Sequence, residues 1–428
     1  MKRKRDALIV IAAAVFAICS LAGGDACATN GTRMLAFSSR DAGMAGATTA
    51  SSEDTSCLVR NPAGLVRIGT RVDVEYENLM GREVMMHTEG AAVPPTLPLP
   101  LPNIGTIQKS TITYLPGGNI AISYRIPGTD SHPVSVGCGV FTMAGVAVDY
   151  PSSRLNIRPL PLGYGVGVYD RMVDLRSVRI APGIAAGITD RLSIGATANI
   201  AIQGLKADLV RTGDATLQET AGSGKWDFAP GAGFTVGLLY RCNDWISLGA
   251  SYESHGWMGH HYKYKDCLPY IDEPPVINAG ISVKPVRKVE VTFDARYINW
   301  TDVKLARMKP HEGGFGWQDQ WVFATGTEWT LCRDKLKLRF GYNYGKSPIQ
   351  PHVVFANALL PVIMEHHFTT GFSWYVANNL SLDFVWEHAF TGVQSDNGCG
   401  DIYSQTGVGT KVSAGGDMIG AGLGYKFN

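Results

Sequence analysis

Two groups of basic residues are the first candidates for a chemical role, because each lies near the end of a segment that alternates in polarity. They are Arg154, Arg158, Arg171 and Arg176 in one group, and Lys304 and Arg307 in the other. An arginine or lysine at one end of an apolar pocket would bind the carboxylate of an otherwise apolar ligand. Each could equally be a solvated loop charge or the partner of a carboxylate such as Asp174, Glu290 or Asp294.

Histidines offer a second kind of candidate chemistry, in the clusters His260-His261 and Glu365-His366-His367. Hydrolysis would need such a group beside a nucleophile. The sequence contains no H-E-x-x-H, G-x-S-x-G or phosphate-binding-loop pattern. Paired histidines at the end of a strand are more often surface residues. We therefore expect no enzyme activity, no cofactor and no metal site.

The N-terminal residues 1–28 are expected to be a signal peptide. A basic run at residues 2–5 precedes an apolar core and the cleavage motif Ala26-Cys27-Ala28. The formal net charge of the whole chain is +1, which does not favour a nucleic-acid partner. An exported protein can form disulfides, but the pairing of the remaining cysteines stays open. These cysteines are Cys57, Cys138, Cys242, Cys267, Cys332 and Cys399.

Alternation of apolar and polar residues dominates the chain after residue 69. It is cleanest over residues 72–77, 192–203, 289–297, 336–344 and 380–387. A period of two residues gives a strand with one apolar and one polar face. In a soluble sandwich the apolar faces would form a shared core, whereas in a membrane barrel they would contact lipid.

Three features favour the membrane barrel. The strands are long enough to cross, charged residues stand in mid-strand on the polar face, and short turns alternate with long connections. We expect an all-β fold with fourteen antiparallel transmembrane strands over residues 70–428. The predicted strands are 70–80, 110–126, 134–148, 173–188, 192–207, 226–241, 245–256, 276–284, 289–300, 320–331, 335–345, 365–376, 380–390 and 412–427.

Residues 29–69 differ from the rest of the chain. This stretch is rich in glycine and alanine, ends in Asn61-Pro62-Ala63-Gly64 and shows no run of alternation. It is expected to be an N-terminal plug, or hatch, inside the lumen of the barrel. The alternative is a flexible tail.

Several motifs resemble the FadL/TodX family of outer-membrane transporters of long-chain fatty acids and other hydrophobic compounds. The matching stretches are residues 37–46, 60–65, 180–183, 190–195, 248–252 and 338–342. The resemblance implies a fourteen-stranded barrel occluded by a hatch, in which Asn61, Pro62 and Ala63 would form the hatch motif. It also implies a kink in the third strand that opens a side window. Candidate bend positions there are Gly137, Gly139 and Gly145.

The resemblance leads us to expect a passive channel of the bacterial outer membrane that takes up hydrophobic molecules and releases them laterally when the hatch shifts. Long-chain fatty acids are the first expectation for the ligand. The alternatives are a channel for aromatic hydrocarbons, a general diffusion porin and, less favoured, an outer-membrane hydrolase. We expect a monomer whose partners are its hydrophobic ligand and the outer-membrane lipid.

Overall fold

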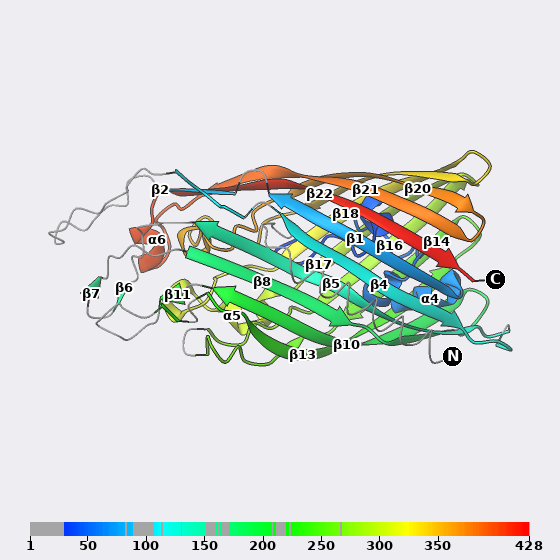
Figure 1. Cartoon of the computed structure of the whole chain (residues 1–428), viewed down its shortest axis with the longest axis horizontal. Helices are drawn as coiled ribbons and strands as arrows, with labels where there is room; N and C mark the ends of the chain where they lie inside the picture. The colour runs from blue at the N-terminus through cyan, green and yellow to red at the C-terminus, as the bar shows by residue number, and fades with distance from the viewer. Residues whose placement is uncertain are drawn as a thin grey trace.

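The computed structural model describes residues 30–81, 84–88, 107–112, 114–129, 131–150, 159–160, 163–164, 171–207, 209–210, 220–221, 224–265 and 268–427. The predicted signal peptide, residues 1–28, lies outside the described residues. The chain forms one long barrel whose strands run obliquely to its axis (Figure 1). Short turns and the C-terminal end lie at one end of the barrel, and the longer connections lie at the other.

Fourteen strand positions close the barrel, which confirms the predicted fold class. Each position pairs with its neighbour in antiparallel register, and the first pairs with the last from Arg71–Lys426 to Gly81–Gly416. The positions are β1 (Arg71–Gly81), β4 (Leu115–Arg125), β5 (Val134–Tyr150), β8 (Arg171–Ile180) with β9 (Gly183–Gly187), β10 (Leu192–Ala207), β13 (Asp227–Arg241), β14 (Ile246–Glu253) with β15 (Trp257–Met258), β16 (Val276–Val286), β17 (Val289–Ile298), β18 (Gln320–Leu331), β19 (Leu336–Gly345), β20 (His366–Ala377), β21 (Leu380–Ser395) and β22 (Thr410–Lys426).

Each predicted strand range overlaps one of these positions. The fourth strand differs from the expectation because it is divided at Ala181 and Pro182 into β8 and β9, which both pair with β10. Proline has no N–H to donate to a ladder, so the pairing is interrupted there.

The wall is apolar outside and polar inside, as a membrane barrel requires. In β17, for example, Val291 and Phe293 are exposed, whereas Glu290, Thr292 and Asp294 are buried. Closure pairs the edges of the sheet, and this removes unsatisfied backbone groups that lipid could not hydrate.

Several short strands and helices lie in the connections between the barrel strands. Strands β2 (Met85–Thr88) and β3 (Ile107–Lys109) extend the outer end, and small hairpins join β6 (Pro159–Leu160) to β7 (Gly163–Tyr164) and β11 (Leu209–Val210) to β12 (Thr220–Ala221). The outer connections also hold η2 (Trp300–Asp302), α5 (Lys304–Arg307), η3 (Pro310–Glu312), η4 (Phe355–Asn357) and α6 (Ile402–Thr406). No helix among the described residues is both long enough and apolar enough to cross a membrane.

The N-terminal segment, residues 30–69, lies inside the barrel, and we call it the hatch. It contains α2 (Ser39–Gly43), α3 (Cys57–Arg60), η1 (Pro62–Gly64) and α4 (Leu65–Ile68). Most of its residues are buried, including the polar ones. Ion pairs tie it to the wall, because Arg40 contacts Asp383 at 3.0 Å and Lys337 contacts Glu53 at 2.5 Å.

Asn61 stabilises the hatch through hydrogen bonds of its side chain. Its Nδ2 donates to the carbonyl oxygens of Thr49 (2.7 Å) and Leu238 (3.0 Å), so it joins two parts of the hatch to β13. Its Oδ1 accepts from the Ala63 N–H at 3.3 Å and caps η1, in which Pro62 occupies a first-turn position. Asn61, Pro62 and Ala63 thus make a local turn that presses against the wall.

Inward-facing glycines of the wall allow this close approach. A Cβ atom on Gly195 would overlap the backbone of Pro62 and Ala63, and one on Gly249 would overlap the carbonyl group of Thr49. These glycines pair across neighbouring strands, so they form a partial ring around the hatch. We call them the glycine ring: Gly195, Gly237, Gly249, Gly280, Gly326 and Gly341.

A bulky side chain in the glycine ring should displace the hatch from the wall. We expect Gly249→Val to destabilise the seated hatch by about 1–3 kcal/mol, because the added atoms have no space against Thr49. Limited proteolysis of the folded barrel should then cut within residues 39–69 faster than in the wild type. The matched control is Ala250→Val, which places the same side chain on the outward face of the neighbouring position. Equal cleavage of both variants would contradict this role of the ring.

Candidate functional site

Strand β5 changes its hydrogen-bonding partner at Met143. From Ser135 to Phe141 it pairs with β4, and the last pair is Asn119–Phe141. The register against β8 then shifts between Thr142 and Ala144, which marks a bulge. Beyond the bulge, the Met143 carbonyl accepts from the N–H of Met34 (3.0 Å), and the Gly145 N–H donates to the carbonyl of Thr32 (3.3 Å). The hatch therefore replaces β4 as the neighbour of β5.

The departure of β5 leaves a gap in the wall between β4 and β5. At one end Thr142 Oγ1 bridges both backbone groups of Gly118, and at the other the Thr111 N–H donates to the Asp149 carbonyl at 2.9 Å. Between these points, the described residues of β4 and β5 form no backbone ladder. The Leu115 side chain covers Gly145 across this interval. We call the interval between these two contacts the β4–β5 gap.

The predicted bend positions lie on both sides of the bulge. Gly145 is two residues beyond Met143 and faces Leu115. Gly137 and Gly139 stand in regular pairs with Ser123 and Ala121. The bulge itself is at Met143, and methionine is not a residue type that indicates a bend in a strand.

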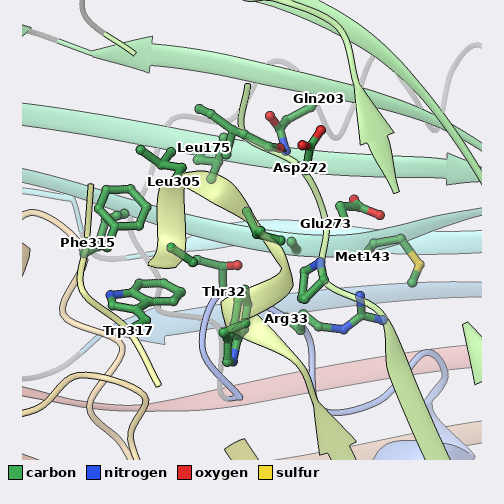
Figure 2. Close-up of a pocket in the computed structure, with 17 residues that line it drawn as sticks. Thr32, Arg33, Met143, Leu175, Gln203, Asp272, Glu273, Leu305, Phe315 and Trp317 are labelled. Atoms are coloured by element: carbon green, nitrogen blue, oxygen red, sulfur yellow. The ribbon is translucent and has the colours of Figure 1, made fainter. Parts of the chain in front are cut away.

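A largely apolar pocket adjoins the bulge on the inside. At one end of the pocket, Met143 and Ala144 of β5 meet Thr32 and Arg33 of the hatch. Figure 2 shows the ring systems of Phe315 and Trp317 beside Leu305, opposite the strands that carry Leu175 and Gln203. The other apolar lining residues are Ile271, Pro274, Trp300, Val303, Ala306 and Leu360.

Four buried charged side chains form an ion network at the hatch end of the pocket. Arg33 donates to both oxygens of Glu253, at 3.0 and 2.7 Å. Arg179 reaches Glu253 at 2.7 Å and Glu273 at 2.5 Å. The two cations and two anions balance, and the hydroxyl of Ser177 also donates to Glu273. This network ties the hatch beside Met34 to β14 and β8.

Two further polar side chains of the pocket, Gln203 and Asp272, also have partners in the protein. Gln203 donates to the Ile271 carbonyl at 3.2 Å, and its oxygen lies 3.0 Å from His261 Nε2. Asp272 accepts from the Met258 N–H at 2.8 Å and lies 3.3 Å from His255 Nε2. A ligand in this pocket would therefore meet apolar surface and polar groups that are already satisfied.

The basic residues predicted from the sequence lie elsewhere. Arg154 and Arg158 are outside the described residues, and only the backbone of Arg171 is described, at the start of β8. Arg176 forms an ion pair with Asp174 at 2.8 Å. On α5, Lys304 and Arg307 are exposed. The two residues between them, Leu305 and Ala306, line the pocket instead.

The sequence does not predict the ion network. A weak signal exists, because Arg179 and Glu253 are charged residues within strands that cross the membrane, and Arg33 is a charge in a small-residue segment. No spacing rule joins them, since Arg33 and Glu253 are 220 residues apart.

The histidine clusters show no arrangement for hydrolysis among the described residues. His260 stacks on Tyr270 with ring centroids 3.7 Å apart, and His261 contacts Gln203. Burial lowers the pKa of His261, although Asp227 opposes this effect, so the ring is neutral at neutral pH. His367 is fully buried in the wall.

Three carboxylates that approach one another, Glu53, Glu290 and Glu328, are neutralised by basic neighbours. Lys337 contacts Glu53 at 2.5 Å and Glu328 at 2.7 Å, and Arg339 contacts Glu328 at 2.7 Å. The cluster therefore has an explanation as ion pairs between hatch and wall.

Solved structures similar to this barrel share its fold at low sequence identity. The toluene transporter TodX of P. putida has 16% identity and a TM-score of 0.64, over 92% of this chain and 99% of that chain. The toluene transporter TbuX of Ralstonia pickettii has 15% identity and a TM-score of 0.62, over 92% and 99%. A Pseudomonas aeruginosa FadL homologue has 14% identity and a TM-score of 0.62, over 95% and 100%.

No curated protein sequence matches this chain. A family model does match, over residues 20–427, and its description is outer membrane protein transport protein (OMPP1/FadL/TodX). This chain therefore belongs to the OMPP1/FadL/TodX family, whose members are non-enzymatic channels for hydrophobic compounds in the bacterial outer membrane.

Proposed function

We propose that this chain is a passive channel for small neutral hydrophobic molecules, of the size of a monoaromatic hydrocarbon, which leave the barrel through the β4–β5 gap. One observation carries the proposal. The aromatic-lined pocket touches both the bulge of β5, at Met143 and Ala144, and the hatch residues Thr32 and Arg33 that pair with it. A ligand in the pocket is thus in contact with the part of the hatch that fills the wall.

The charges around the pocket favour a neutral ligand. Asp272 and Glu273 border it, and Arg33, the one cation that lines it among the described residues, is paired with Glu253. A carboxylate would lose its hydration without gaining a free cation among the described residues. The long-chain fatty acid expected from the sequence stays a prediction. TodX and TbuX, which have the same fold, are named as toluene transporters.

A general diffusion porin is less favoured because its lumen would have to be open. The described hatch residues fill the lumen and contact the glycine ring backbone to backbone. Water-filled porins leave an aqueous channel at this position.

Lateral release needs two local changes. The hydrogen bonds from Met34 and Gly145 must break, and Leu115 must move away from Gly145. Both lie at the β4–β5 gap, so the rest of the wall can stay closed. A ligand drives this change only as far as it binds the open arrangement better than the closed one.

Uptake by cells that lack other hydrophobic-compound channels tests the ligand class. We expect uptake of toluene to exceed uptake of oleate at equal concentration, and Ala306→Phe to reduce toluene uptake at least fivefold by filling the pocket. Ala295→Phe, on the outward side of β17, is the control and should transport normally. Faster uptake of oleate than of toluene would overturn the neutral-ligand proposal.

A disulfide across the β4–β5 gap tests the exit route. A Cβ atom on Gly117 would lie 3.6 Å from Thr142 Cβ, within the range of disulfides. We expect oxidised Gly117→Cys/Thr142→Cys to lose most uptake and a reductant to restore it, because the bond holds β4 against β5. Each single variant is a control. Undiminished uptake by the oxidised double variant, with the bond verified by mass spectrometry, would exclude this exit.

Weakening the ion network should release the hatch residues beside Met143. In Glu253→Gln, Arg33 and Arg179 lose a buried charge partner, a loss that costs about 3–5 kcal/mol in buried pairs. A Thr32→Cys reporter should then react with a water-soluble maleimide at least tenfold faster. Asp190→Asn, in an exposed turn, is the control. Identical labelling rates would show that the network does not hold this segment.

A further inference from the structure

A second pocket lies at the end of the barrel with the short turns, where α4 and the C-terminal strand meet (Figure 1). Short turns face the periplasm in such barrels. The pocket lies between the hatch and the wall and is partly open to solvent. Five basic residues line it against a single acidic one, Glu53, and we call it the basic pocket. The basic residues are Arg40, Arg67, Arg71, Lys337 and Lys426.

Three of these cations are held by carboxylates of the protein. Arg40 pairs with Asp383 at 3.0 Å, Arg71 with Asp73 at 2.5 Å, and Lys337 with Glu53 at 2.5 Å. They form the inner wall of the pocket. These contacts fix their geometry and neutralise their charge, so the unbalanced positive charge of the pocket belongs to its other two cations.

The other two cations, Arg67 and Lys426, lack such partners. Among the described residues, the nearest hydrogen-bond acceptor of Arg67 is Ser247 Oγ at 3.5 Å, and no acceptor contacts the Lys426 ammonium group. The Lys426 side chain packs beside Gly69, two residues after Arg67.

We propose that the basic pocket binds a small oxyanion, a phosphate or carboxylate group, from the periplasm. Arginine and lysine donors bind such groups with charge-assisted hydrogen bonds. The anion would bridge Arg67 of the hatch and Lys426 of the wall, and so strengthen the seat of the hatch. The pocket is lined by hatch residues inside the barrel end, so a soluble anion reaches it more directly than a lipid headgroup does. This proposal is independent of the transported ligand.

Binding of inorganic phosphate to the full mature chain in neutral detergent tests the proposal. Titration calorimetry should give one saturable site, and phosphate should raise the unfolding temperature more than an equal ionic strength of chloride. In Arg67→Gln/Lys426→Gln the affinity should fall at least tenfold. Both side chains are exposed, so folding should survive. Lys288→Gln, an exposed cation in the turn between β16 and β17, should bind phosphate as the wild type does.

Two results would overturn the proposal. One is equal phosphate binding by the wild type, the double variant and Lys288→Gln, and the other is no saturable binding by the wild type. A lipid source is distinguished by vesicles of phosphatidylglycerol and of phosphatidylcholine. Stabilisation by phosphatidylglycerol alone, without any response to free phosphate, would exclude a soluble anion as the occupant.

Discussion

Every backbone N–H and C=O group in a membrane wall needs a partner, and at Met143 that partner comes from inside the barrel. Strand β5 leaves β4 and takes the hatch residues Thr32 and Met34 as its neighbours. Lipid could not satisfy the freed groups, so β5 can leave β4 only because the hatch is there. The gap in the wall and the hatch are therefore one structural feature. Movement of one changes the other.

This dependence divides the hatch into two parts with different freedom to move. Residues 39–69 are seated against the glycine ring, where Gly195, Gly249 and Gly326 contact the backbone of the hatch directly. The part beside the bulge is held by two backbone hydrogen bonds and by the ion network at Arg33. Such hydrogen bonds contribute about 0.5–1.5 kcal/mol each. Local release of this part is thus much less costly than removal of the whole hatch.

The barrel was predictable from the sequence because a half-buried strand imposes a period of two on its residues. In β17, up to Tyr297, and in β19 the apolar side chains face outward and the polar ones inward, so the fold can be predicted from local sequence. The hatch was predictable from the absence of that period. The bulge at Met143 was not, since it depends on a partner segment more than 100 residues earlier in the chain.

The candidate site was less predictable than the fold, because residue type alone does not say which way a side chain points. Lys304 and Arg307 have the chemistry to bind a carboxylate, but the single turn of α5 directs Leu305 and Ala306 into the pocket and leaves the two cations exposed. Glu253 and Arg33 meet only after the barrel has closed around the hatch.

Four buried charges beside an apolar pocket need a reason, because such networks contribute little to stability compared with apolar packing. Their value here is that they fix one arrangement of the hatch beside the β4–β5 gap. An apolar ligand cannot compete for these charges, so it can favour release only through the apolar surface that it buries. The best small ligands gain up to about 1.5 kcal/mol per non-hydrogen atom, or roughly 10 kcal/mol for a molecule the size of toluene. Breaking two hydrogen bonds and one buried ion pair costs about 4–8 kcal/mol. Only the difference between the binding free energies of the open and closed arrangements can offset this cost. Apolar contacts alone can therefore open the gap when most of them form in the open arrangement, without any polar group on the ligand.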